Sequence, residues 1–307
     1  MTMRVDWLRG CGTALVTPFT AAGDVDEPRF RALVERQIAG GVSLLVPCGT
    51  TGEAATLADA EQHRLVALTV EAARGRARVL AGVGSNATAV TIDRARAARD
   101  AGSDAVLVVA PYYNKPTQAG LRAHFHAVAK AVDDLPMVLY NVPGRTASNI
   151  SAATTLALAG ERDNIVGTKE ASGDLSLVMA ILRERPAHFR VLAGEDALTL
   201  PLIALGADGL ISVVSNEVPE LTARLTALAL AGDWDTARAL HYRLLPLMEA
   251  NFIESNPGPV KAALALMGLL EEHCRLPLVP VQEQTRARVR AVLAELGVLR
   301  DGAHVAA

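Results

Sequence analysis

The stretch AGSDAVLV at residues 101–108 places a glycine shortly before a short apolar run. The same order recurs in AGGVSLLV at 39–46 and in LGADGLIS at 205–212. Glycine adopts the left-handed backbone conformation at little cost, so it can end a helix just before a buried strand begins. Three corners of one kind, spaced far apart along the chain, predict a fold built from repeated helix–strand units.

Eight short apolar runs between residues 11 and 215 continue this pattern. Most of them are apolar throughout, which is typical of parallel strands covered on both faces by helices. The segments between them have helical spacing, as in the stripe formed by Phe30, Leu33 and Ile38. The predicted strands are 12–18, 43–48, 78–84, 104–111, 137–143, 165–170, 190–195 and 209–214.

The alternation of eight strands with helices indicates an α/β fold, and a closed (β/α)8 TIM barrel rather than an open doubly wound sheet. The GxGxxG fingerprint of dinucleotide-binding sheets is also missing. Later in the chain only helical patterns remain, over 218–252 and 284–299. The sequence therefore predicts two domains, a catalytic barrel over 1–232 and a C-terminal helical domain over 233–307.

The overall composition narrows the class of protein. The 307 residues carry a formal charge of −3, and half of them are hydrophobic. This charge gives no general attraction to nucleic acid or to anionic membranes. No apolar run approaches the roughly 18 residues of a membrane span, and no signal-type apolar region opens the chain, so we expect a cytoplasmic protein.

Cysteine and histidine give no sign of a metal centre. Cys11, Cys48 and Cys274 are widely separated and form no CxxC pair, which argues against a disulfide framework and against structural zinc. His124 and His126 are two residues apart, a spacing that points them to different parts of a helix. We therefore expect no metal site.

Lysine is rare in this chain. Of 30 basic residues, four are lysine and 26 are arginine, and one of the four, Lys169, lies in the apolar run IVGTKE. Barrel enzymes place reactive groups at the C-terminal ends of strands, and burial favours the neutral amine, which can attack a carbonyl carbon. Lys169 is therefore a candidate Schiff-base nucleophile. The alternative is a structural lysine paired with Glu170 or another carboxylate.

Hydroxyl groups gather at the same strand ends. Tyr112, Tyr113 and Tyr140 are three of the four tyrosines in the chain, and Thr50 follows the second predicted strand. Phenols can transfer protons during imine formation, and a threonine hydroxyl can link two of them. The alternative role of these tyrosines is packing at the rim of the barrel with the hydroxyl in water.

Two further groups could bind carboxylates. GTTGE at 49–53 is a turn whose successive N–H groups could cradle an anion, although tight turns of this composition are common. The guanidinium of Arg145 could bind a second carboxylate through two parallel hydrogen bonds. The alternative is a surface salt bridge. No glycine-rich phosphate loop follows the last two predicted strands. These residues indicate a Schiff-base lyase or aldolase that needs no cofactor and acts on small carboxylated carbonyl compounds.

Six motifs, in order and covering the chain from about residue 11 to its end, resemble the dihydrodipicolinate synthase family of the class I pyruvate-dependent aldolases. These motifs are GTALVTPF (12–19), GTTGEAATL (49–57), APYYNKPTQAGL (110–121), LYNVPGRT (139–146), GTKEASGD (167–174) and RLPLVPV (275–281). The resemblance implies a barrel enzyme that condenses pyruvate with L-aspartate 4-semialdehyde in the diaminopimelate route to lysine.

The resemblance also implies catalytic roles. Lys169 matches the lysine that forms the imine with pyruvate, and Tyr140 matches the tyrosine that relays protons to and from it. Thr50 matches the hydroxyl that links Tyr140 to a second tyrosine. Tyr113 matches that second tyrosine, which in the family comes from a neighbouring subunit. We therefore expect a homo-oligomer, at least a dimer, and a tetramer built as a dimer of dimers if the resemblance extends that far.

Substrate-binding residues are implied in the same way. Thr51, with the backbone N–H groups of Thr50 and Thr51, matches the cradle for the pyruvate carboxylate. Arg145 matches the residue that binds the carboxylate of the semialdehyde, and Ile211 matches a backbone carbonyl near the lysine. Gly194 completes the predicted substrate-binding set.

Two alternatives stay open beside this function. One is another pyruvate-dependent aldolase or lyase of the superfamily, such as an N-acetylneuraminate lyase, although Arg145 favours a short dicarboxylate product. The other is a non-catalytic, ligand-sensing barrel, which would need at least one broken catalytic position. Cys48 stands where the family admits small residues, so we expect it to pack in the core.

Some family members are inhibited by lysine at a dimer-interface site. Asn86 and Tyr112 match that site, but other positions lack the polar, histidine and acidic groups expected there. A valine cannot pair with the ammonium group of the effector, so we expect inhibition by lysine to be weak or absent. The departing positions are Ala54, Asp59, Gln62 and Val90.

Overall fold

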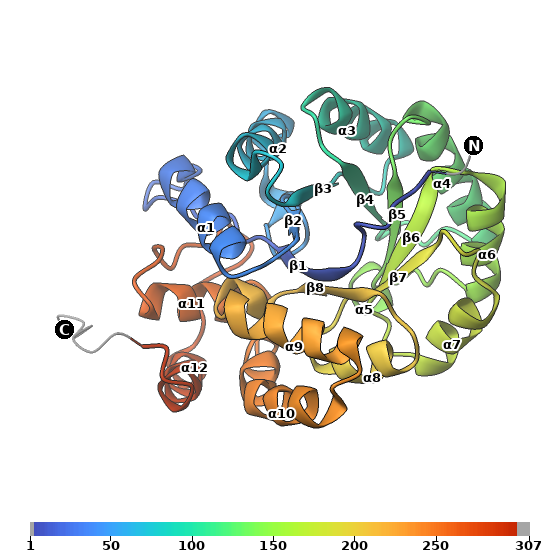
Figure 1. Cartoon of the computed structure of the whole chain (residues 1–307). Helices are drawn as coiled ribbons and strands as arrows, with labels where there is room; N and C mark the ends of the chain where they lie inside the picture. The colour runs from blue at the N-terminus through green and yellow to red at the C-terminus, as the bar shows by residue number, and fades with distance from the viewer. Residues whose placement is uncertain (1–2, 300–307) are drawn as a thin grey trace.

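The computed structural model describes residues 3–299, and its strands form a closed parallel barrel. Each strand pairs with its neighbour in chain order, and the eighth closes the barrel against the first (Figure 1). The predicted (β/α)8 barrel and its eight strands are therefore confirmed. The strands are β1 (Gly10–Ala14), β2 (Leu44–Val46), β3 (Arg78–Gly82), β4 (Ala105–Val109), β5 (Met137–Asn141), β6 (Ile165–Glu170), β7 (Arg190–Ala193) and β8 (Gly209–Ser212).

Helices surround the barrel and cover the outer face of its strands (Figure 1). The first begins at Asp26, whose Oδ1 accepts a hydrogen bond from the backbone N–H of Arg29 at 3.0 Å. None of the helices within residues 3–299 is long and apolar enough to cross a membrane. The helices are α1 (Glu27–Ala39), α2 (Asp59–Ala73), α3 (Thr88–Asp100), α4 (Gln118–Ala131), α5 (Pro143–Thr146), α6 (Ala152–Glu161), α7 (Leu175–Glu184), α8 (Thr199–Ala204), α9 (Pro219–Ala231), α10 (Trp234–Ala250), α11 (Gly258–Leu266) and α12 (Glu283–Glu295).

The glycine corners have the predicted geometry. Gly41, Gly102 and Gly206 have φ angles of 83°, 86° and 110°, which lie in the region that other residues rarely adopt. Each comes after a helix and leads into a strand. The repeated turn chemistry therefore reverses the chain at three αβ corners, as the sequence predicts.

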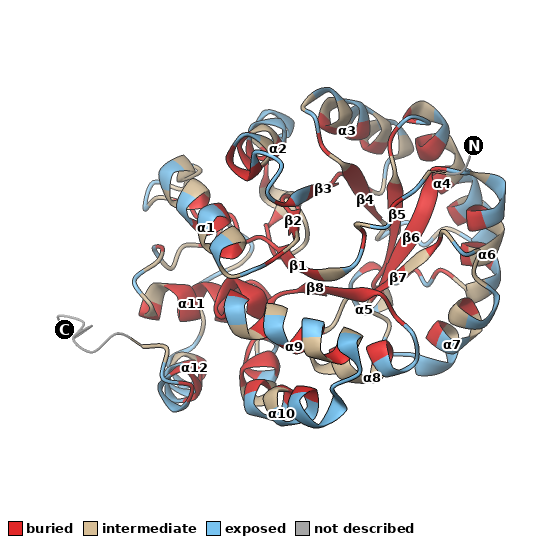
Figure 2. Cartoon of the chain, in the orientation of Figure 1, coloured by how far each residue is buried: buried red, intermediate tan, exposed pale blue. Residues whose placement is uncertain are grey.

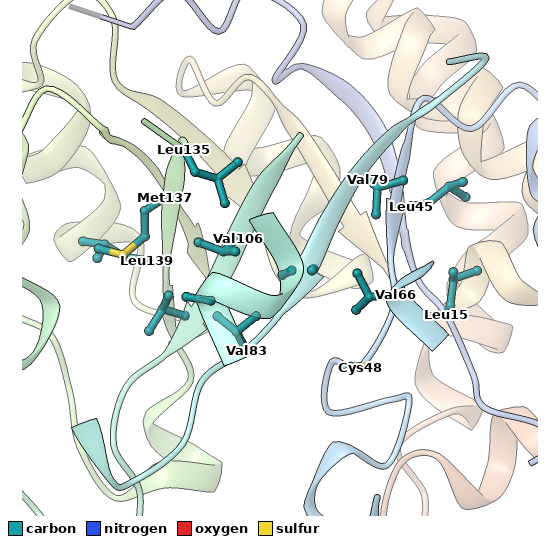
Figure 3. Packing of buried hydrophobic residues seen from close by; sticks show 14 of the residues in the cluster. Leu15, Leu45, Cys48, Val66, Val79, Val83, Val106, Leu135, Met137 and Leu139 are labelled. Carbon is teal, nitrogen blue, oxygen red and sulfur yellow. The ribbon is translucent and has the colours of Figure 1, made fainter. Parts of the chain in front are cut away.

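Two apolar layers hold the barrel together. Side chains such as Leu44, Leu107 and Ile211 cluster inside the barrel. Residues at alternate positions, such as Leu45 and Val106, point outward and pack beneath the helices (Figure 3). Figure 2 shows the result, with strands buried along their length and helices buried on one side. Burial on both faces explains why the strand sequences are continuously apolar.

The chain after the barrel forms a helical extension on one side of it (Figure 1). Gly232 ends α9 in the left-handed conformation and Asp233 caps α10, so the predicted boundary falls between two helices. Leu244 of α10 and Val289 of α12 share an apolar cluster with Val214, next to the barrel. The extension thus packs on the barrel. Its status as a separate domain over 233–307 remains our proposal, and residues 300–307 lie outside the described part.

One helix of the C-terminal extension was not predicted. The chain forms α11 in the segment where the sequence suggested neither strand nor helix, between the two predicted helical stretches. All residues of this helix but one are buried, including Lys261. A helix without a polar face lacks the amphipathic period that marks a surface helix in a sequence.

Candidate active site

Lys169 lies near the end of β6, directly opposite Tyr140 on β5. The Nζ of Lys169 is 4.2 Å from the centroid of the Tyr140 ring, and the residue is only 5% exposed. Tyr140 belongs to the cluster inside the barrel, so the amine points to the barrel interior rather than to the helices. The predicted nucleophile and proton relay are therefore side by side.

A break in the strand register turns Lys169 inward. Met137 pairs with Ile165, but the next residue, Val138, pairs with Gly167, so one residue of β6 is bulged. Without the bulge, strict alternation would point Lys169 to the helix side, because Val166 already faces the interior. A Cβ at Gly167 would lie 2.6 Å from the backbone oxygen of Arg190, so glycine lets β7 approach here.

The alternative role of Lys169 as the partner of Glu170 is wrong. The Glu170 carboxylate accepts hydrogen bonds from Asn141 Nδ2 at 3.1 and 3.2 Å and from the backbone N–H of Ser172 at 2.9 Å. Burial raises the pKa of Glu170, and these hydrogen bonds offset part of the rise. Within residues 3–299, no carboxylate forms an ion pair with Lys169. The amine is buried without a salt-bridge partner.

The end of β7 packs against the lysine. A Cβ at Gly194 would lie 3.1 Å from Lys169 Cε and 2.8 Å from Ala171 Cβ, so a larger residue would displace the amine. Asp196, which follows, accepts hydrogen bonds from the backbone N–H groups of Val213 and Val214 at 2.9 and 3.1 Å. Burial raises the pKa of Asp196. This carboxyl therefore fixes the loop after β8.

A cavity of about 350 Å³ opens beside Tyr140 at the C-terminal ends of the strands. Thr50 and Arg145 also line the cavity. The structure therefore brings these two predicted residues, which follow different strands, close to Tyr140. Arg145, on the short helix α5, is exposed. Among residues 3–299 its side chain makes one hydrogen bond, to the backbone oxygen of Asn256 at 3.4 Å, which leaves most of the guanidinium free within that range. Further lining residues are Cys48, Gly84, Arg94, Leu107, Tyr112 and Leu278.

The turn after β2 has the features of an anion cradle. Its carbonyl at Gly52 accepts a hydrogen bond from Thr17 Oγ1 at 2.7 Å, and Glu53 N–H bonds to Thr50 O at 3.1 Å. In contrast, the backbone N–H groups of Thr50 and Thr51 have no acceptor among the described residues. Two successive free N–H groups beside the cavity suit a carboxylate.

Five of the predicted residues are not among those that line the cavity, namely Lys169, Thr51, Tyr113, Gly194 and Ile211. Tyr113 is 88% exposed, with a φ of 73°, and it is Tyr112 that lines the cavity. Ile211 is fully buried on β8 in the cluster that includes Tyr140. Cys48 packs in the core, as predicted, and burial raises the pKa of its thiol to about 12 (Figure 3).

A buried ion pair connects this turn to the C-terminal extension, and the sequence did not reveal it. Lys261 of α11 donates from Nζ to Glu53 Oε1 and to the backbone oxygen of His273 at 2.8 Å. The backbone N–H of Arg275 donates to the second Glu53 oxygen at 3.0 Å. Burial lowers the pKa of Lys261, while Glu53 raises it in part. The pair joins residues 208 apart in the chain, so no local pattern could have indicated it.

A metal ion has no evident place in this site. Across the described residues, no three side chains of His, Cys, Asp or Glu are grouped so that they could hold one. The groups present at the site are an amine, phenols, hydroxyls and the guanidiniums of Arg94 and Arg145.

The model of the dihydrodipicolinate synthetase family matches residues 7–296. The chain belongs to this family. A 4-hydroxy-tetrahydrodipicolinate synthase from Koribacter versatilis is 54% identical to it over 295 residues, covering 96% of this chain and 98% of the relative. The family is thus assigned over nearly the whole chain, including the motifs that carry the resemblance.

Solved structures of the family match the barrel closely. The dihydrodipicolinate synthase of Acinetobacter baumannii, complexed with pyruvate, has a TM-score of 0.93 and 42% identity, covering 95% of this chain and all of that one. A monomeric dihydrodipicolinate synthase variant has the same TM-score and identity, covering 95% of this chain and 98% of its own. Family membership alone therefore does not fix the number of subunits.

Proposed function

We propose that this chain is a 4-hydroxy-tetrahydrodipicolinate synthase, a lyase that condenses pyruvate with L-aspartate 4-semialdehyde in the diaminopimelate route to lysine. The observation that carries the proposal is the buried amine of Lys169, which forms no ion pair with a carboxylate in residues 3–299 and lies 4.2 Å from the Tyr140 ring centroid. The 54% identity to a relative with this activity supports it.

The first half of the reaction needs an amine and a proton relay. The Lys169 nitrogen attacks the keto carbon of pyruvate, and the carbinolamine loses one water to give an imine. Tyr140 supplies the proton that the leaving hydroxyl needs, and Thr50 links this phenol to a second one. The imine withdraws electrons from the pyruvate methyl group, so that a proton can leave and an enamine can form. No cofactor is required for this step.

The second half joins the two substrates. The enamine carbon attacks the aldehyde carbon of the semialdehyde, and the new oxygen takes up a proton. The amino group of the semialdehyde then displaces Lys169 from the imine carbon, which closes the ring and frees the enzyme. Over the whole cycle one water is released. Arg145 binds the carboxylate of the semialdehyde, while the N–H groups of Thr50 and Thr51 bind that of pyruvate.

Three parts of the predicted site extend this proposal. Tyr113 is 88% exposed, as suits a residue that reaches the site of a neighbouring copy. We therefore propose a homo-oligomer, a tetramer built as a dimer of dimers, with Tyr113 as the second phenol of the relay. We propose that the carbonyl of Ile211 and the backbone at Gly194 contact the substrate beside the lysine; a Cβ at Gly194 would lie 3.1 Å from Lys169 Cε, which supports this role for Gly194. A cytoplasmic location fits a biosynthetic enzyme of this kind.

Trapping the imine tests the proposal. The chain is incubated with pyruvate and borohydride, digested, and searched by mass spectrometry for a reduced pyruvyl adduct. We expect it on Lys169, with none on Lys169→Ala and an unchanged adduct on Lys130→Ala, which changes a surface lysine. In a coupled assay, the wild type should turn over the semialdehyde and not N-acetylneuraminate. Product formation by Lys169→Ala would refute the mechanism, and an adduct without turnover would favour a ligand-sensing barrel.

A further inference from the structure

Asn256 contacts both of the groups proposed to bind carboxylates, although it comes from the C-terminal extension. Its Nδ2 donates a hydrogen bond to Thr51 Oγ1 at 3.0 Å. Its backbone oxygen accepts one from Arg145 Nη2 at 3.4 Å. The residue is 4% exposed and borders the cavity, just before α11. One residue therefore connects two loops that belong to different strands of the barrel.

The direction of the Thr51 hydrogen bond matters for its chemistry. An amide nitrogen can only donate, so the Thr51 oxygen acts as the acceptor. The hydroxyl proton of Thr51 then remains available for another partner. Because the adjoining N–H groups of Thr50 and Thr51 have no acceptor among the described residues, all three donors can serve one carboxylate.

Packing alone does not account for an asparagine at this position. In residues 3–299, its Oδ1 is buried and accepts no hydrogen bond. Burying an unpaired amide oxygen costs free energy, and an apolar residue of similar size would avoid this cost. Among the described residues, the bond from Nδ2 to Thr51 Oγ1 is the contact that a hydrocarbon side chain at this position could not make.

The same turn is attached to the extension a second time. Glu53, two residues after Thr51, is bound by Lys261 and by the backbone N–H of Arg275. Lys261 lies five residues after Asn256, so the two attachments run side by side. The turn is held at two points, by Asn256 just before α11 and by Lys261 within α11, which limits how far Thr51 can move.

We propose that Asn256 is a positioning residue for both substrates, and this inference depends on the function proposed above. Through Nδ2 it orients the Thr51 hydroxyl toward the carboxylate of pyruvate. Through its backbone oxygen it sets one arm of Arg145, which leaves the rest of the guanidinium for the carboxylate of the semialdehyde. The C-terminal extension is therefore part of the binding site and not only a structural appendage.

Steady-state kinetics of the full-length chain test this inference. Asn256→Leu should raise the KM for pyruvate about tenfold with kcat within about threefold, because a contact that binds ground and transition states equally is lost. Asn256→Asp keeps the shape of the side chain, but its carboxylate accepts the hydroxyl proton of Thr51, so the KM for pyruvate should rise as well.

Asn251→Leu is the matched control. Asn251 is also buried in the extension. In the part of the chain that the structure describes, its Nδ2 makes one hydrogen bond, to Glu217 at 2.7 Å, and its Oδ1 accepts none.

A double variant distinguishes the positioning of Thr51 by Asn256 from a general loss of rigidity in the site. If Asn256 acts through Thr51, then Thr51→Val combined with Asn256→Leu should have the pyruvate KM of Thr51→Val alone. An unchanged pyruvate KM in both Asn256→Leu and Asn256→Asp would overturn the inference, as would an equal rise in Asn251→Leu. If Asn256→Leu does not fold, the pyruvate KM of Asn256→Asp tests the inference on its own. A wild type without turnover would instead refute the proposed function, and this inference with it.

Discussion

Lys169 and Tyr140 face each other inside the barrel because one residue of β6 is bulged between the pairs Met137–Ile165 and Val138–Gly167. The bulge reverses the side-chain alternation of β6 before the lysine. An amine in an apolar interior is therefore placed over a phenol ring, instead of pairing with the neighbouring Glu170.

Tyr140→Phe should distinguish the contribution of the aromatic ring from that of its hydroxyl. The phenylalanine keeps the packing against Lys169 but cannot relay a proton, so kcat should fall about 10²-fold or more. Borohydride should still trap pyruvate on Lys169, only more slowly. Tyr242→Phe, at a tyrosine that is 63% exposed on α10, is the control. Turnover of Tyr140→Phe within about threefold of the wild type would show that another group moves the proton.

Arg145→Ala should weaken the use of the semialdehyde and leave imine formation with pyruvate unchanged. Charge-assisted bonds to a carboxylate contribute about 1.5–3 kcal/mol, so the KM for the semialdehyde should rise about 10- to 100-fold. The rate of pyruvate trapping on Lys169 should not change. Arg145→Lys keeps the charge without the fork and should lie between wild type and Arg145→Ala. Equal loss of trapping and of semialdehyde use would assign the arginine a different role.

The sequence predicts the barrel well because the information about it is local. A buried parallel strand is apolar along its length, and a glycine corner shows itself within a few residues, as at Gly102 and Gly206. Strand ends in a barrel meet at one mouth, so the side chains of Lys169, Tyr140 and Thr50 could be expected there before the structure was known.

The C-terminal half of the site could not be predicted, because its contacts are not local. Asn256 lies in SNPGPVK, where two prolines suggest a loop, and its partner Thr51 is 205 residues away. Lys261 and Glu53 are 208 residues apart. The bulge that turns Lys169 inward also depends on pairing with β5, which the sequence of β6 does not encode alone.

Gly194→Ala should disturb the lysine directly. The added Cβ would lie 2.8 Å from Ala171 Cβ and 3.1 Å from Lys169 Cε, so the neighbours must shift. We expect at least a tenfold loss of kcat/KM and about 1–3 kcal/mol of destabilisation in urea unfolding. A Cβ added at Gly160 on α6 would meet no other part of the described chain within 4 Å, so Gly160→Ala should stabilise the fold slightly. Full activity of Gly194→Ala would contradict the contact.

The contribution of His124 to the stability of the fold should fall between pH 7 and pH 5. Burial lowers the pKa of this imidazole from 6.5 to about 4, so the folded chain keeps it neutral while the unfolded chain binds a proton. The unfolded state thus gains about 2 kcal/mol relative to the folded state over this range. His124→Gln should remove that part of the pH dependence in urea unfolding. His126→Gln changes a histidine on the same helix whose side chain is 45% exposed, and it is the control. Identical pH profiles for wild type and His124→Gln would disprove the assignment.

Free lysine should inhibit turnover weakly or not at all. The polar groups near the expected effector position already have partners, since Asp59 pairs with Arg94 at 2.7 Å and Gln62 Nε2 donates to Ala54 O at 2.9 Å. Val90 offers no charge for the ammonium group of the effector, and an unpaired ammonium at an interface would lose its hydration without compensation. In the coupled assay, turnover at saturating pyruvate should be unchanged by millimolar lysine. Half-inhibition at sub-millimolar lysine would show that the effector binds without these contacts.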